Sequence, residues 1–253
     1  MVGKCEAVIR HSDKETIKFP DYIQENDVPQ VVDYFCDDAV RPYIVVCPGG
    51  GYELLSYAHE GTEIVKWLND AGFHAGIYLY PLAPKIDPET FITAEQELLT
   101  DLDSDDRISR VFVLGFSAGA HAAGLFGMTP SQKLAGIVLC YPVVSLTAPF
   151  RHEGSANNFL KNAFKPNAAT VYSLENVIHS NYPRTFIWHT VTDDAVPYDN
   201  SLRLAQALKS HKVPFELHLF EEGHHGLGLA KTTLTACQWP VLVESWLKAI
   251  TSE

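Results

Sequence analysis

Residues 110–121, with the sequence RVFVLGFSAGAH, restrict the fold of this chain more than any other stretch. Residues 111–114 form an apolar run with the β-branched and aromatic content that is typical of a buried strand. The pentapeptide GFSAG follows at 115–119 without a linker, and the small residues at 120–127 can begin a helix. The segment therefore predicts a strand, a sharp turn and a helix in immediate succession.

The pentapeptide fits the pattern G-x-S-x-G of a nucleophile elbow, with Ser117 at its centre. Glycines on either side of the serine let the strand and the helix pass close to each other, because they carry no Cβ atom. The helix N-terminus then directs its N–H groups and dipole at the reacting centre. A tight turn in a Gly/Ala-rich region is the alternative interpretation, but the flanking strand and helix favour Ser117 as a nucleophile.

Two later strand–loop units supply partners for a serine nucleophile. A serine hydroxyl becomes reactive when a histidine accepts its proton and a carboxylate orients that histidine. In this architecture the acid and the histidine follow the serine in that order, after later strands. Residues 185–190 predict a strand that leads to Asp193 and Asp194, and residues 215–220 predict a strand that leads to His224 and His225.

Each of these partners has a neighbour that competes for the same role. One acid of the pair can be a solvated loop charge or an acid at a helix N-terminus. One histidine of the pair must likewise be a bystander, and the chain has 11 histidines in all, so a histidine alone indicates little. The residues themselves leave both choices open.

Four segments in chain order carry a resemblance to a known family: CPGGGY at 47–52, GFSAGAH at 115–121, TDDAVP at 192–197 and GHHGLGLA at 223–230. The chain resembles α/β-hydrolase serine esterases of the acetyl-xylan-esterase and carbohydrate-esterase group, related to the hormone-sensitive-lipase and dienelactone-hydrolase branches. In such families the acid belongs to a D-x-x-V-P pattern, which implies Asp193 rather than Asp194. The histidine directly precedes a glycine, which implies His225 rather than His224.

The glycine run at 49–51 follows the predicted strand 43–47, where the family carries an HGGG-type loop. Ester hydrolysis builds negative charge on the carbonyl oxygen, and each preorganised N–H donor stabilises it by about 3–4 kcal/mol. The resemblance implies an oxyanion hole made by the N–H groups of Gly50, Gly51 and Ala118. A flexible turn is the alternative, whereas a phosphate loop would need a lysine after these glycines. The chain departs from the family at Cys47, since many members have histidine before the glycines.

Alternating strand and helix patterns predict an α/β fold, in which one doubly wound, mostly parallel sheet has helices on both faces. The predicted strands are 43–47, 74–80, 111–116, 135–141, 185–190 and 215–220, and the predicted helices lie near 60–71, 88–101, 118–127, 198–211 and 236–250. Short β-like runs at 7–9, 16–19 and 31–35 predict an antiparallel start to the sheet. We predict a single domain over 1–253, a length that is ordinary for such folds.

The least regular segment, 143–183, lies between two predicted core strands, where hydrolases of this fold commonly insert a cap. Residues 160–164 and 171–178 are predicted as short helices, and a cap of this modest size suits a small acyl group. A connection that only packs on the surface is an equal alternative. Tyr52, Phe116 and His121 are the predicted substrate-binding residues, with a core position as the alternative for each.

Composition limits the remaining classes of function. A net charge of −12 argues against nucleic-acid and anionic-membrane partners. Histidine, cysteine and acidic residues do not fall in metal-ligand spacing, so we predict no metal and no cofactor. Five cysteines without a C-x-x-C motif, and a first segment without the apolar run of a signal peptide, predict a cytoplasmic protein with reduced thiols. A homodimer is compatible with the sequence, although no residue specifies it.

The sequence therefore predicts a serine carboxylesterase in which Ser117 attacks the ester, His225 transfers protons and Asp193 orients His225. The resemblance favours short acyl chains, most of all acetyl groups on a sugar or a xylooligosaccharide. Two alternatives stay open: an amide hydrolase (peptidase or formamidase) with the same triad, and a hydrolase fold that binds a small molecule without catalysis.

Overall fold

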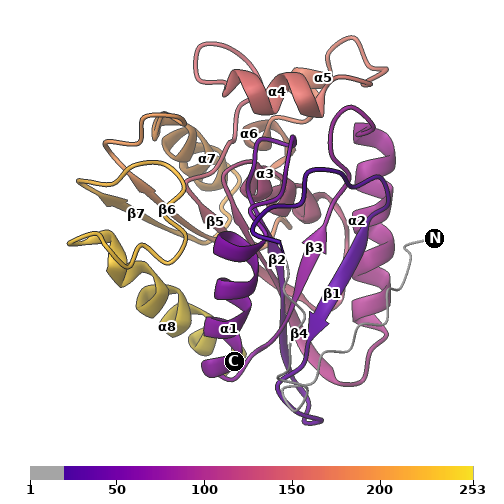
Figure 1. The fold of residues 1–253 in the computed structure, drawn as a ribbon, viewed down its shortest axis with the longest axis vertical. Coiled ribbons are helices and arrows are strands. Elements are labelled where there is room, and N and C mark those ends of the chain that lie inside the picture. The colour runs from indigo at the N-terminus through magenta and orange to yellow at the C-terminus, as the bar shows by residue number, and fades with distance from the viewer. Residues whose placement is uncertain (1–19, 253) are drawn as a thin grey trace.

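The computed structural model describes residues 20–252, and its centre is a seven-stranded sheet with the order β1-β3-β2-β4-β5-β6-β7 (Figure 1). The strands are β1 (Gln30–Tyr34), β2 (Arg41–Cys47), β3 (His74–Leu79), β4 (Ile108–Phe116), β5 (Leu134–Cys140), β6 (Arg184–Thr190) and β7 (Phe215–Phe220). Strand β1 pairs antiparallel with β3, and the other neighbouring pairs are parallel. This topology confirms the predicted α/β class with a doubly wound, mostly parallel sheet.

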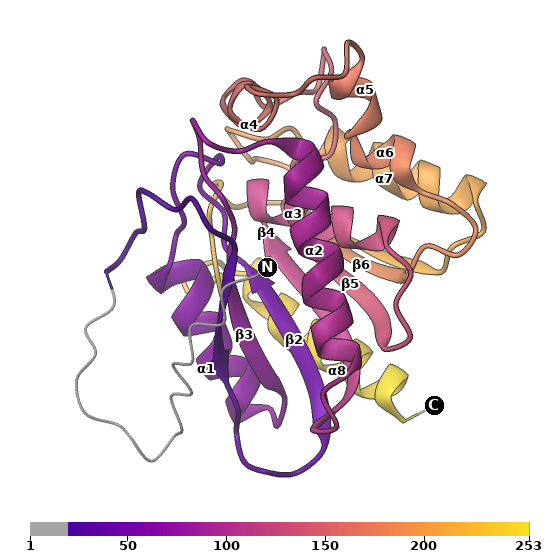
Figure 2. The same ribbon diagram turned by 90° about the vertical axis from the view of Figure 1, so that its right-hand side faces the viewer.

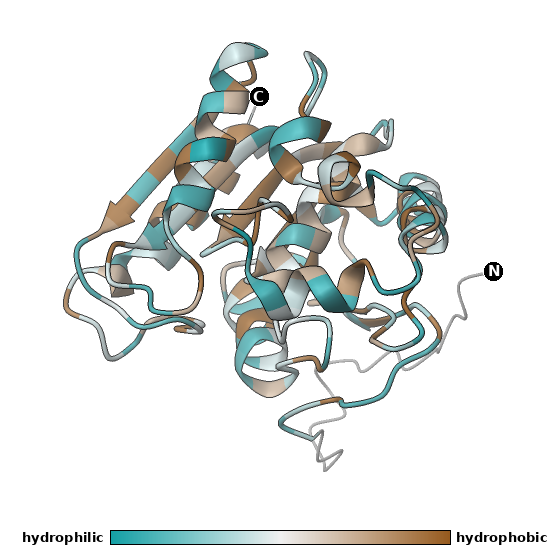
Figure 3. Ribbon diagram, turned by 90° about the horizontal axis from the view of Figure 1, so that it is seen from above, coloured by the Kyte–Doolittle hydropathy of each residue, from teal (hydrophilic) through white to brown (hydrophobic). Residues whose placement is uncertain are grey.

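The burial of each strand follows from its place in the sheet. The central strands β4 and β5 are covered on both faces, which is why their sequences read as continuous apolar runs. The edge strand β7 instead mixes intermediate and exposed positions, and its residues alternate between brown and teal in Figure 3. The two strands that lead to the glycine loop and to the predicted nucleophile, β2 and β4, therefore end in the buried part of the sheet.

Helices cover both faces of the sheet. The larger ones are α1 (Glu63–Asp70), α2 (Pro88–Asp103), α3 (Ala118–Leu125), α7 (Asp199–Ser210) and α8 (Trp239–Thr251). Figure 2 shows α1 and α2 on opposite sides of β2 and β3. Neighbouring residues of β3 reflect this arrangement: Tyr78 packs on Phe91 of α2, with ring centroids 6.4 Å apart, while Ile77 faces Gly61 beside α1. Helix α8 lies on the same side as α1, since the Trp67 and Trp239 rings are 5.3 Å apart.

Of the three β-like runs near the N-terminus, 31–35 corresponds to β1, whereas 7–9 and 16–19 lie outside the described residues. The predicted helix near 60–71 has two parts, the π-helical turn η1 (Ala58–Thr62) followed by α1. Within residues 20–252, no helix is both long enough and apolar enough to cross a membrane.

The segment 143–183 forms three short helices, α4 (Glu153–Phe159), α5 (Ala168–Val171) and α6 (Leu174–Val177), above the carboxyl ends of the strands (Figure 1). The helix predicted at 160–164 is wrong, because the chain turns there and Phe164 is 84% exposed. The helix forms earlier instead, where Ala156 and Phe159 share a buried face. Helix α6 falls within the predicted range 171–178. The single domain and the role of 143–183 as a cap stay predictions.

Candidate active site

The turn between β4 and α3 has the geometry of a nucleophile elbow. Ser117 joins the two elements with φ 53° and ψ −118°, a backbone conformation that is rare outside glycine. A Cβ atom on Gly115 would lie 2.2 Å from the carbonyl oxygen of Gly119, and a Cβ on Gly119 would lie 2.2 Å from the carbonyl oxygen of Cys47. The two glycines therefore allow the close approach of strand and helix that the sequence predicts.

The structure brings Ser117, His225 and Asp193 together. The Oγ atom of Ser117 lies 2.7 Å from Nε2 of His225, and Nδ1 of His225 lies 2.7 Å from Oδ2 of Asp193. With a neutral imidazole, Nδ1–H donates to the carboxylate and Nε2 accepts the serine proton. The arrangement can deprotonate the serine hydroxyl and keep the resulting imidazolium beside a carboxylate.

Asp193 follows β6 and has a side chain that is only 1% exposed. Its Oδ1 atom accepts hydrogen bonds from the backbone N–H groups of Ala195 (3.0 Å) and Val196 (2.8 Å). Burial by itself would raise the pKa of Asp193, but hydrogen bonds from His189, His225 and the backbone outweigh burial and hold this pKa well below its usual range. The carboxylate therefore stays charged beside His225.

Asp194 and His224, the neighbours that compete for the two roles, make other contacts. Asp194 is exposed, and its Oδ1 atom is 3.5 Å from the backbone nitrogen of His225. His224 is also exposed, and its Nδ1–H donates to the carbonyl oxygen of His225 at 2.6 Å. Neither side chain is part of the hydrogen-bonded chain from Ser117 to Asp193.

The glycine loop after β2 lies against the nucleophile, since a Cβ on Gly49 would be 3.1 Å from Cβ of Ser117. The N–H of Gly49 is already used, because it donates to Oε2 of Glu60 at 2.8 Å. Among residues 20–252, the N–H groups of Gly50, Gly51 and Ala118 have no such acceptor. Gly50 (φ 130°) and Gly51 (φ 66°) have positive φ angles that favour glycine. These three N–H groups are the ones the resemblance implies for an oxyanion hole.

Tyr52, Phe116 and His121 are fully buried behind the site, which corrects the expectation that they line a substrate pocket. The hydroxyl of Tyr52 donates to Nδ1 of His121 (2.6 Å), and Nε2–H of His121 donates to the carbonyl oxygen of Tyr172 (2.7 Å). Burial lowers the pKa of His121 to about 4. The three side chains support the loops from the core, because a side chain without exposed surface offers nothing to a substrate.

His152, at the start of α4, is a half-buried group that the sequence analysis did not single out. Its Nδ1 atom accepts hydrogen bonds from the hydroxyl of Ser155 (2.8 Å) and from the N–H of the same residue (3.2 Å), so Nε2 carries the proton. Burial lowers the pKa of His152, and the nearby charge of His225 lowers it further. Asn158 of the same helix donates to the carbonyl oxygen of Gly51 at 2.9 Å. Helix α4 therefore packs on the glycine loop, next to the triad.

His189 on β6 is another polar residue outside the predicted site, and it is fully buried. Its Nε2–H lies between Oδ2 of Asp193 (3.2 Å) and the carbonyl oxygen of Val196 (3.0 Å). Its Nδ1 accepts from the hydroxyl of Ser201 at 2.8 Å. A histidine within an apolar strand, four residues before the acid, is the sequence signal that could have revealed it.

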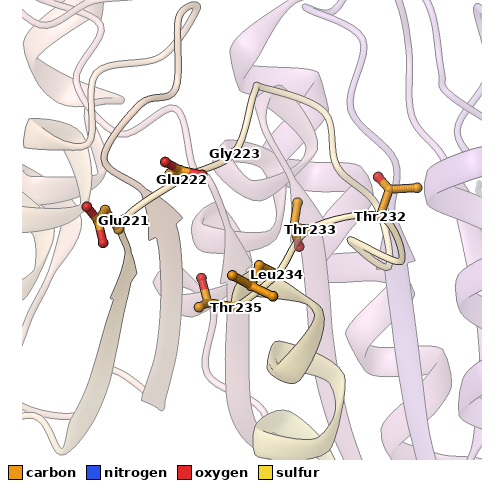
Figure 4. A pocket seen from close by; sticks show the side chains of 7 residues that line it. All are labelled: Glu221, Glu222, Gly223, Thr232, Thr233, Leu234 and Thr235. Atoms are coloured by element: carbon orange, nitrogen blue, oxygen red, sulfur yellow. The ribbon is translucent and has the colours of Figure 1, made fainter.

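A separate hollow of about 460 Å³ lies between the loop after β7 and the segment before α8 (Figure 4). Its lining consists of Glu221, Glu222, Gly223 and residues 232–235, and it includes no member of the triad. Across residues 20–252, histidine, cysteine and acidic side chains form no group of three that could hold a metal ion.

Comparison with protein-family models matches residues 88–251 to the prolyl oligopeptidase family. The chain belongs to this family. An acetyl ester-xyloside bifunctional hydrolase from Caldicellulosiruptor lactoaceticus is 39% identical, with a TM-score of 0.80 over 88% of this chain and 89% of that one. The family assignment and this solved fold confirm the resemblance to α/β-hydrolase esterases.

Two curated relatives are longer proteins. Endo-1,4-β-xylanase B of Butyrivibrio fibrisolvens is 30% identical over 219 residues, which are 77% of this chain and 34% of that protein. An acetylxylan esterase of Xylanibacter ruminicola is 28% identical over 247 residues, which are 92% of this chain and 51% of that protein. The chain thus spans a third to a half of the length of these two relatives.

Proposed function

We propose that the protein is a serine carboxylesterase that hydrolyses short-chain, acetyl-type esters. One observation carries the proposal: Ser117, His225 and Asp193 form a continuous chain with two 2.7 Å contacts, beside a glycine loop in which the N–H groups of Gly50 and Gly51 have no acceptor among residues 20–252. Of the comparisons, the solved acetyl ester-xyloside hydrolase and the acetylxylan esterase support ester chemistry.

In the proposed reaction, the Oγ atom of Ser117 attacks the ester carbonyl carbon while Nε2 of His225 takes the hydroxyl proton. The carbonyl oxygen becomes negatively charged and accepts hydrogen bonds from Gly50, Gly51 and Ala118. His225 then gives its proton to the departing alkoxide, which leaves as the alcohol. A water molecule, deprotonated by His225, attacks the acyl-enzyme and releases the acid and free Ser117.

The acyl group is proposed to be short because helix α4 packs directly on the glycine loop. Asn158 donates to the carbonyl oxygen of Gly51, which holds α4 against this loop. The proton on Nε2 of His152, at the start of the same helix, is a donor suited to a sugar hydroxyl. Acetylated sugars or xylooligosaccharides are therefore the proposed natural substrates.

An amide substrate is the second candidate, and the family assignment favours testing it, since the matching family is named for an oligopeptidase. The same triad serves both reactions, but an amidase must protonate a poor amine leaving group. A binding protein without catalytic activity is the third candidate. The unbroken hydrogen-bonded chain from Ser117 to Asp193 argues against it.

The decisive experiment compares hydrolysis of p-nitrophenyl acetate, butyrate and octanoate by the wild type and by Ser117→Ala, with p-nitroacetanilide as the matched amide. We expect activity that falls with chain length, is lower on the amide, and drops by roughly 10⁴-fold or more in the variant. Faster hydrolysis of the amide would favour the amidase. Equal activity in both proteins would contradict Ser117 as the nucleophile, and tight binding of an ester without hydrolysis would favour the binding protein.

A further inference from the structure

Glu60 is a buried carboxyl group, 4% exposed, that the proposed reaction does not use. It lies in the π-helical turn η1, a rare type of helix that often occurs at functional sites. Its Oε2 atom accepts the N–H of Gly49 at 2.8 Å, and its Oε1 atom accepts the hydroxyl of Tyr141 at 2.7 Å. Both carboxylate oxygens therefore have a donor, which is the requirement for keeping such a group in the interior.

Tyr141 connects Glu60 to the loop that carries His225. Its hydroxyl oxygen accepts the N–H of Gly228 at 2.9 Å while donating its own proton to Glu60. Its ring packs edge-on against the ring of His225, with centroids 5.1 Å apart. Tyr141 has a φ of 38°, a strained conformation for a residue with a side chain. Such strain persists only where surrounding contacts fix the residue, and it concentrates at functional sites.

The links through Glu60 and Tyr141 reach both the glycine loop and the loop that carries His225. Gly49 precedes the two glycines of the proposed oxyanion hole, and Gly228 follows His225 by three residues. A second contact from the same turn strengthens the connection, since Nε2 of His59 lies 3.1 Å from the carbonyl oxygen of Gly226. One buried carboxyl group therefore joins the glycine loop to the histidine loop.

The charge of Glu60 also bears on His225. Burial raises the pKa of Glu60, while the hydrogen bonds from Tyr141 and Gly49 and the charge of His225 oppose that rise. Asp193 bonds directly to His225, and the other titratable groups near His225 are His152, Asp194, His224 and Tyr141. Besides Asp193 and Asp194, Glu60 is thus a buried acidic group that can interact, across Tyr141, with the imidazolium that forms when His225 takes the serine proton.

We propose that Glu60 and Tyr141 are positioning residues, which hold the glycine loop and the histidine loop in register with Ser117, and that the Glu60 carboxylate stabilises protonated His225. This inference rests on the proposed esterase function. It differs from the triad assignment because neither residue takes part in a step of the proposed reaction.

The test compares Glu60→Gln and Tyr141→Phe with Glu95→Gln, a matched control. Glu95 is a fully buried carboxyl group on α2 that is not part of the site. We expect kcat on p-nitrophenyl acetate to fall about 100-fold in Glu60→Gln, the loss typical of a misplaced catalytic group, with a smaller change in KM. The fall in kcat should be smaller in Tyr141→Phe, and Glu95→Gln should keep the wild-type kcat. Circular dichroism and urea unfolding verify that each variant is folded.

The pH profile separates a charge effect from a loss of packing. Removing a negative charge near His225 disfavours its protonated form, so the acidic limb of kcat/KM should move to lower pH in Glu60→Gln. Tyr141→Phe keeps the carboxylate and should move that limb less. A wild-type kcat and an unmoved acidic limb in Glu60→Gln would overturn the inference.

Amide hydrogen exchange gives a readout that does not depend on turnover. In Glu60→Gln the N–H groups of Gly49 and Gly228 should exchange faster than in Glu95→Gln, because their acceptors are lost or displaced. Faster exchange supports the positioning role even if the wild type is inactive on esters. Inactivity on esters would contradict only the proposed function. Unchanged exchange of both amides would overturn the positioning role.

Discussion

Gly119 of α3 packs directly against the carbonyl oxygen of Cys47 at the end of β2, so closely that a Cβ atom on Gly119 would lie 2.2 Å from that oxygen. The carbonyl oxygen of Pro48 would be equally close. The obstacle is backbone on both sides, so neither partner can turn away as a flexible side chain would. This contact joins the helix that follows Ser117 to the strand that leads into the glycine loop.

We therefore expect Gly119→Ala to lower the free energy of unfolding by about 1–3 kcal/mol or more, as overpacked core substitutions do. Because helix and loop must separate, kcat on p-nitrophenyl acetate should fall as well. Urea unfolding measures the change in the free energy of unfolding. Gly154→Ala in α4 is the control, since a Cβ there meets only ordinary contact at 3.4 Å, and alanine in a helix should keep or slightly raise the free energy of unfolding. Equal stability of the two variants would contradict the steric argument.

The two neighbouring aspartates provide a second prediction. Asp193→Asn should reduce kcat by roughly 10⁴-fold with little change in fold, because an amide cannot hold His225 in the tautomer that accepts the serine proton. Asp194→Asn should keep kcat within a few fold, since its exposed side chain has only a 3.5 Å contact with the backbone of His225. Steady-state kinetics of the two variants decide between the acids, and a larger loss in Asp194→Asn would reverse the assignment.

The fully buried His121 predicts that the protein loses stability in mild acid. Burial lowers the pKa of His121 from its ordinary 6.5 to about 4 in the folded state. As the pH falls below 6.5, the unfolded chain takes up a proton that the folded chain refuses, so stability decreases down to about pH 4 and then levels off. Between pH 7 and pH 4.5 this contribution amounts to about 2–3 kcal/mol.

His121→Gln removes the titration while retaining a donor for the carbonyl oxygen of Tyr172 and an acceptor for the hydroxyl of Tyr52. Urea unfolding at pH 7 and pH 4.5 is the measurement. The wild type should lose about 2–3 kcal/mol more than the variant between these two pH values. Parallel losses in both proteins would show that His121 is not the group responsible.

The strand pattern alone places Ser117, an acid pair and a histidine pair after strands, and the family resemblance chooses Asp193 and His225 within the pairs. Ser117 directly follows β4, Asp193 lies in the loop after β6 and His225 in the loop after β7, and parallel strands bring their carboxyl ends to one edge of the sheet. Local patterns carry this information because a strand and the turn after it are close in sequence. The glycines of the elbow were predictable for the same reason.

The residues that support the site could not be predicted in this way. Glu60 is a charged residue ahead of an amphipathic helix, a place that is usually exposed, and only its contacts with Gly49 and Tyr141 show otherwise. The sequence leaves a pocket position and a core position open for His121, and the structure buries every residue of α3. Helix α4 has few apolar residues in its sequence, so no periodic pattern indicated its start. Each of these outcomes depends on contacts between distant segments.

Glu95 gives the last prediction, because its fully buried carboxyl group has no hydrogen-bond partner among residues 20–252. Burial raises the pKa of Glu95 well above its ordinary value of 4.5. As the pH rises above 4.5, the unfolded chain ionises while the folded chain stays protonated, so stability falls until the folded pKa is passed. Glu95→Leu should therefore stabilise the protein at pH 8 by about 1–3 kcal/mol or more, the desolvation penalty of an unpaired polar group, and by less at pH 4.

Glu95→Gln is the matched control for this variant, since it removes the ionisation but keeps an unpaired polar group in the same place. Urea unfolding at pH 4 and pH 8 should show, in both variants, a gain in stability over the wild type that grows with pH. Only Glu95→Leu should also show a gain in stability that is independent of pH. A gain in Glu95→Leu that is equal at both pH values would assign the effect to packing alone. That result would mean that the Glu95 carboxyl group is hydrogen-bonded or hydrated in the folded wild type, because only such a group could ionise in the core without a loss of stability.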